Sequence, residues 1–73
     1  MPDQTTALQN IDAARMYLQE AGKLSDVISI RDKAMAMAAY AEAQGASDAA
    51  QMAKELQLRA ERKAGTFLAD MDK

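Results

Sequence analysis

The chain contains no cysteine, no histidine and no tryptophan. Without cysteine, neither disulfides nor thiolate sites can form. Without histidine, the chain lacks the commonest metal ligand and the usual general base near neutral pH. Its three glycines are isolated from one another, so no glycine-rich phosphate loop is present. The sequence therefore predicts a protein that is not an enzyme, with no catalytic residue, no metal and no cofactor.

Long apolar runs are also missing. No run approaches the roughly 20 residues that a membrane-spanning helix needs. The N-terminal MPDQTT has neither the basic nor the apolar region of a signal peptide. The net charge of −2 disfavours a general nucleic-acid coat, which would be strongly basic. These features predict an intracellular protein with no membrane partner and no small-molecule substrate.

Few aromatic residues and a short chain limit the core. With 73 residues and three aromatics, the chain forms one domain at most, and that domain buries little apolar surface. Small domains usually gain stability from disulfides, a metal or a partner. Since cysteine and histidine are absent, a protein partner or a second copy of the chain is the expected source.

Strong helix formers dominate what is present, and no stretch alternates apolar and polar residues for long. The apolar periodicity predicts helices at about 7–21, 26–44 and 48–71 within a single domain, 1–73. Short connections make successive helices antiparallel neighbours. The predicted fold is all-α, either a three-helix up-down-up arrangement or a long helical hairpin with a shorter flanking helix.

Local signals mark the helix ends. Thr6 and Ser25 are predicted N-caps, because their hydroxyls can accept a bond from a free amide of the first turn. Gly22 and Gly45 are predicted to end the first two helices in the left-handed conformation. The third helix is predicted to start near Ser47.

Apolar residues that recur every three or four positions predict a buried seam on each helix. The predicted seams are Ala7, Ile11, Ala14, Leu18 and Ala21; Val27, Ile30, Ala34, Met37 and Ala41, widened by Ile28, Met35 and Ala38; and Ala49, Ala53, Leu56, Ala60, Ala64, Phe67 and Met71. Met35 and Met37 are two residues apart, so one of them should face a third element or a partner. Gly65 leaves three alternatives: a bend, a close backbone approach, or a separate last turn capped by Thr66.

A group of cations is the candidate partner-binding site, and we call it the basic ridge. Arg59, Arg62 and Lys63 stand at i, i+3 and i+4 and share one helix face. The ridge would be extended by Lys54 and, across the hairpin, by Arg31 and Lys33.

The basic ridge has two interpretations. It either contacts phosphate or an acidic protein surface, or it is a solvated face on which Glu55 pairs with Arg59. Nucleic acid is the less favoured partner, because stacking aromatics and a recognition helix are not visible.

The segments IRDKAMAMAAYAEAQG (30–45) and AAQMAKELQLRAERKAGTFLADM (49–71) resemble an α-helical segment of phage- and plasmid-type proteins. The resemblance covers roughly residues 18–71, and its most distinctive pieces are 30–34 and 58–65. In that family the segment often precedes a DNA-binding or partition-like region. Since this chain ends at Lys73, we expect that region to be absent, and its activity is not carried over.

The resemblance implies a mobile-element protein in the cytoplasm of a bacterial host cell. Together with the composition, it predicts a small non-enzymatic helical binding protein that inhibits or regulates a host protein by occupying its surface. An anti-CRISPR-type target in host defence is one example. The alternative is a self-associating dimerisation module of a DNA-binding or partition-type system. A third hypothesis is direct DNA binding through the basic ridge.

Overall fold

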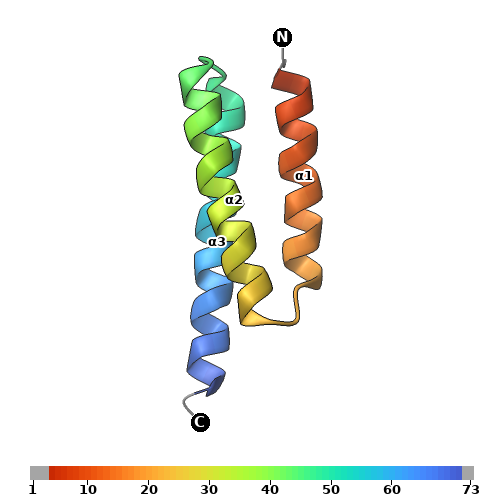
Figure 1. Cartoon of the computed structure of the whole chain (residues 1–73), viewed down its shortest axis with the longest axis vertical. Helices are drawn as coiled ribbons and strands as arrows, with labels where there is room; N and C mark the ends of the chain where they lie inside the picture. Colours follow the sequence, from red (N-terminus) through yellow and green to blue (C-terminus); the bar gives the residue numbers. More distant parts are fainter. Residues whose placement is uncertain (1–3, 72–73) are drawn as a thin grey trace.

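Three helices make up the described part of the chain. The computed structural model describes residues 4–71, with side chains from Leu8 onward. The helices are α1 (Gln4–Glu20), α2 (Leu24–Ala43) and α3 (Ser47–Met71), and no strand occurs among these residues. Successive helices run in opposite directions, with α2 and α3 side by side and α1 beside them (Figure 1). The predicted all-α, three-helix arrangement is confirmed. None of the described helices is both long and apolar enough to cross a membrane.

The helices pack along seams made largely of alanine. α2 and α3 form the most extensive contact, and α1 packs against both. Among residues 8–71, the buried core consists of Ile11, Ala14, Leu18, Val27, Ile30, Ala34, Ala38, Ala41, Ala49, Ala50, Ala53, Leu56 and Ala60. Alanine on facing helices lets their axes approach closely. The result is a thin rod with extents of 47 × 17 × 14 Å.

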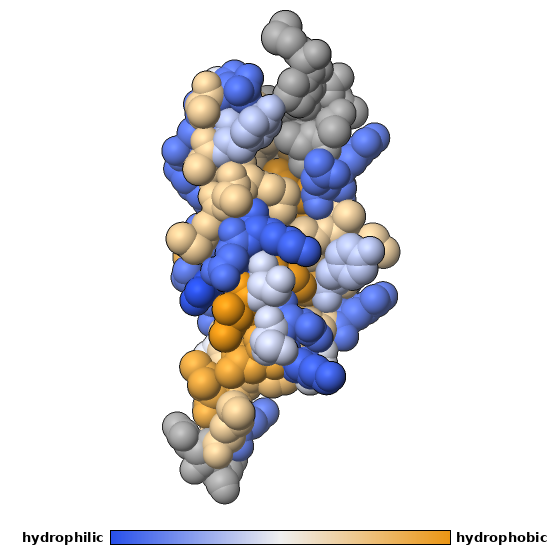
Figure 2. All heavy atoms as spheres, in the orientation of Figure 1, coloured by the Kyte–Doolittle hydropathy of each residue, from blue (hydrophilic) through white to orange (hydrophobic). Residues whose placement is uncertain are grey.

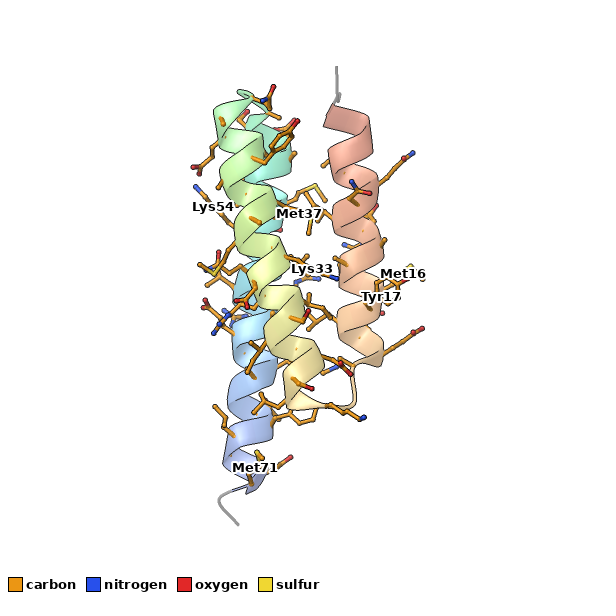
Figure 3. The ribbon with its side chains drawn as sticks, viewed as in Figure 1. Met16, Tyr17, Lys33, Met37, Lys54 and Met71 are labelled. Carbon is orange, nitrogen blue, oxygen red and sulfur yellow. The ribbon has the colours of Figure 1, made fainter. Side chains whose placement is uncertain are left out.

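Most of the predicted seam positions are buried, with exceptions at the seam edges. Met37 is half-buried and points from α2 towards α1 (Figure 3). Met35, which was predicted to widen the seam, is instead 48% exposed, and Met71 is 71% exposed. The prediction for Met35 was wrong because alanine seams are narrow, so a long side chain at the edge stays outside. The prediction for Met71 was wrong because the last turns of α3 extend beyond the start of α2 (Figure 1 and Figure 3). The side chain of Ala7 lies outside the described residues.

The turn between α2 and α3 follows the prediction for Gly45. Gly45 has a φ of 74°, and its amide donates to the Glu42 carbonyl at 3.1 Å. The Ala46 amide donates to the Ala41 carbonyl at 2.9 Å. These two bonds define a Schellman motif, which satisfies carbonyls at the helix end and requires the left-handed conformation that glycine adopts without strain.

The other predicted helix ends differ from the structure. α1 begins at Gln4, so Thr6 lies inside the helix; its side chain is outside the described residues. Gly22 does not have a positive φ, so it is not a left-handed cap. The N-cap of α2 is Lys23, not Ser25, because the Lys23 carbonyl already accepts the amides of Asp26 and Val27 at 3.1 and 3.2 Å.

Helix α3 is continuous through Gly65. The helix runs unbroken to Met71, so Gly65 does not start a separate turn. The Thr66 hydroxyl donates to the Arg62 carbonyl at 3.2 Å, one turn back, instead of capping a new helix. Gly65 is exposed, and a Cβ added there would meet nothing within 4 Å. Within this chain, no close approach requires a glycine at that position.

Candidate protein-interaction surface

Lys63 has a structural contact within the fold. Its ammonium group reaches from α3 to the end of α1, where it donates to the carbonyls of Leu18 and Gln19 at 2.5 and 3.3 Å. Those carbonyls belong to the last turn of α1 and lack the full set of helical partners. A cation there also interacts favourably with the negative end of the helix dipole. Lys63 therefore ties α1 to the hairpin of α2 and α3.

Two further cations of the basic ridge are paired with carboxylates. Lys54 forms an ion pair with Glu42 across the α2–α3 groove, and Lys54 points away from α1 in Figure 3. Arg31 pairs with its neighbour Asp32 at 3.1 Å. Both pairs are exposed, so each contributes little stability and can exchange partners easily.

The remaining cations lie on other sides of the rod. Lys33 points from α2 towards α1 (Figure 3) and lines a shallow hollow with Tyr17. Arg59 lines a small hollow between α1 and α3 together with Arg15. Arg62 is exposed, and neither Arg59 nor Arg62 has an ion-pair partner among residues 4–71.

The structure therefore spreads the six cations around the rod. Arg59 and Lys63 lie towards α1, whereas Lys54 lies in the groove on the side away from α1. The predicted pairing of Glu55 with Arg59 is not among the ion pairs of the described residues. Partner binding by these six residues stays a prediction, and their placement does not form one continuous basic surface.

A different candidate surface lies on α2 and α3, on the side away from α1. The Lys54–Glu42 pair joins the two helices there and shows which side of each helix faces this surface. Residues at helical spacing from these two share the face. We call it the outer face: Leu24, Ile28, Arg31, Met35 and Glu42 on α2, and Lys54, Leu58, Glu61, Gly65 and Leu68 on α3.

Five apolar side chains lie along the outer face, interrupted by Arg31 on α2 and by Glu61 on α3. Met35, Leu58 and Leu68 are 48%, 54% and 52% exposed, and Leu24 and Ile28 are half-buried. Figure 2 shows hydrophobic surface in the lower half of the view, over the C-terminal half of α3 and the first turns of α2. Exposed apolar side chains gathered on one face are typical of a protein-interaction site.

Sequence reasoning did not identify the outer face, although its spacing is visible. The signal is the repeat Lys54, Leu58, Glu61, Gly65 and Leu68, which has steps of four and three. On α2, Ile28 and Met35 were predicted to widen the buried seam, so they were not recognised as part of an exposed face. Helical periodicity identifies which residues share a face, but the packing decides which faces are covered.

Large apolar side chains are more often exposed than buried in the described part of the chain. Seven are exposed: Met16, Tyr17, Met35, Tyr40, Leu58, Leu68 and Met71. Only five are buried: Ile11, Leu18, Val27, Ile30 and Leu56. Single exposed apolar residues are normal on the surface of a monomer, whereas several on one face indicate an interaction site. Met35, Leu58 and Leu68 share the outer face and are such a group.

The described residues show no arrangement suited to a metal or to buried acid–base chemistry. No group of three or more carboxylates is placed to hold a metal ion among the described residues. No polar or charged side chain is buried among the described residues. The arrangement can make surface contacts through apolar groups and exposed ion pairs. Comparison with protein families, with curated proteins and with solved structures finds no match to this chain.

Proposed function

We propose that the chain is a non-enzymatic helical binding protein that works through protein–protein contacts made by its outer face. The observation that carries the proposal is the group of exposed apolar side chains, Met35, Leu58 and Leu68, beside the half-buried Leu24 and Ile28. Covering such a patch contributes roughly 25 cal/mol for each Å² of apolar surface removed from water.

The setting we propose is a phage or other mobile element in a bacterial cell, where the protein inhibits or regulates its target by occupying a surface. The sequence resemblance over residues 18–71 supports this setting. Two placements favour the outer face over the basic ridge as the contact surface: Lys63 is engaged by the end of α1, and the six cations are spread around the rod.

The test compares two single variants in capture from bacterial lysate, followed by titration with the purified captured protein. Leu58→Glu places a charge in the outer face. Met16→Glu is the matched control, because Met16 is 61% exposed and points outward from α1 (Figure 3).

Leu58→Glu is expected to weaken binding at least about tenfold, as for a residue near the centre of an interface. Met16→Glu should bind like the unmodified chain. Equal affinity of both variants for every protein partner, a second copy of the chain included, would refute the proposed function.

A further inference from the structure

The outer face carries a self-complementary arrangement of charge. At the end near the α2–α3 turn, α2 presents Glu42 and α3 presents Lys54. Further from that turn, α2 presents Arg31 and α3 presents Glu61. Met35 and Leu58 lie between the two pairs of charges, and the other apolar residues of the face lie beyond Arg31 and Glu61. The four charges therefore alternate in sign. Such a pattern is complementary to a copy of itself, because a two-fold rotation brings opposite charges together.

Two outer faces can be stacked with the two-fold axis either along the rod or across it, and both arrangements bring opposite charges together. With the two-fold axis along the rod, α2 lies over α3 of the second copy, and Arg31 meets its Glu61. With the axis across the rod, α2 lies over α2, and Arg31 meets the second copy's Glu42. In neither arrangement do like charges oppose each other, so a second copy is not repelled.

The accessible surface of a single copy is large for its mass. A compact monomer of 7.9 kDa would expose about 4,400 Å², whereas this chain exposes 5061 Å². The difference is about 650 Å². A single copy therefore leaves more surface in contact with water than a compact monomer of the same mass.

Gly65 is the third observation. It lies in the outer face, inside a continuous helix, where glycine costs about 1 kcal/mol relative to alanine. Nothing in the chain explains it, because a Cβ at Gly65 would meet no atom within 4 Å. A glycine at this point lets a second backbone approach α3 closely.

We infer that the outer face binds a second copy of this chain. The two α2–α3 hairpins then form a four-helix bundle with Gly65 at a close contact, and α1 of each copy stays outside. This inference rests on the proposed function, since it names the occupant of the same surface. The occupant follows from the alternating charges, the excess surface and the unexplained glycine.

Sedimentation equilibrium on the purified chain tests the inference. The expected mass is twice 7.9 kDa for the unmodified chain and for Met16→Glu. Leu58→Glu should shift the dimer towards monomer by at least tenfold in dissociation constant while keeping its helical circular dichroism. An unmodified chain that stays monomeric at millimolar concentration overturns the inference. The proposed function would survive that result if Leu58→Glu still lost a different purified partner.

Charge reversal tests the pairing directly. Glu61→Arg is expected to weaken dimerisation, because it places like charges together in either arrangement. Rescue by Arg31→Glu in the same chain supports the two-fold axis along the rod. Rescue by Lys54→Glu supports the axis across it. A dimer that Glu61→Arg leaves unchanged would contradict face-to-face pairing.

Gly65→Leu separates stability of the single chain from association. Leucine is the better helix former, so the monomer should become more resistant to unfolding. The dimer should weaken, because the added side chain fills the close contact. A variant that is more stable and dimerises as well as the unmodified chain would exclude Gly65 from the interface.

Discussion

Replacing Lys63 with methionine is expected to loosen α1 from the hairpin. The substitution removes the ammonium group that donates to the Leu18 and Gln19 carbonyls. Methionine keeps an apolar side chain of similar length, so the packing of the lysine stem is largely preserved. The variant thus isolates the polar contact at the C-terminal end of α1.

The expected cost follows from the geometry of that contact. A cation at a helix C-terminus contributes about 0.3–1 kcal/mol when exposed and up to ~2 kcal/mol when partly buried. Lys63 is half-buried, whereas Gln19 is exposed, so water can replace part of the lost bonding. We expect a loss of about 1–2 kcal/mol, which corresponds to a drop in Tm of about 5–15 °C for a domain of this size.

Thermal and urea unfolding at low micromolar concentration, followed by circular dichroism, measures this loss. Arg62→Met is the matched control, because Arg62 is exposed and its side chain has no ion-pair or hydrogen-bond partner among the described residues. The control should change stability by less than about 0.5 kcal/mol. Hydrogen exchange should show the largest loss of protection in α1. Equal effects of the two substitutions would refute the role assigned to Lys63.

Three further comparisons use paired substitutions, each measured by urea unfolding of the monomer. Gly45→Ala should cost about 1 kcal/mol because its φ is 74°, whereas Gly22→Ala, without a positive φ, should be neutral or stabilising; equal costs would contradict the turn geometry. Leu56→Ala should cost about 2–5 kcal/mol because Leu56 is 2% exposed, whereas Leu58→Ala should cost less than about 0.5 kcal/mol. Lys54→Gln should cost less than about 1 kcal/mol, since its pair with Glu42 is exposed; a larger loss would show that the pair stabilises the single chain.

The sequence predicts features whose causes are local. The three helices follow from residue preferences and apolar periodicity, which act within a few turns. The turn at Gly45 is equally local, because the penalty for a left-handed residue depends on that residue alone. Met35 was misplaced because periodicity does not show how wide a seam becomes once alanine lines both helices.

Features that depend on distant contacts were not predictable from local patterns. Gly22 was expected to end α1 as a left-handed cap, but carbonyls of the last turn accept bonds from Lys63, more than 40 residues away. This contact occupies the Lys63 ammonium group within the fold. The helical spacing of Arg59, Arg62 and Lys63 shows only that they share a face, not that one of them binds another helix. The outer face depends on which sides of α2 and α3 remain uncovered after α1 has packed.

The alanine seam connects the core to the outer face. Eight of the thirteen buried residues in the described chain are alanines, and each buries one methyl group, about 0.8 kcal/mol. A large apolar side chain contributes about 1.5–3 kcal/mol when fully buried. The chain thus places small groups where its helices meet and leaves Met35, Leu58 and Leu68 outside. Those side chains add stability only when a second surface covers them, so the stability of the folded chain should rise with the concentration of whatever binds the outer face.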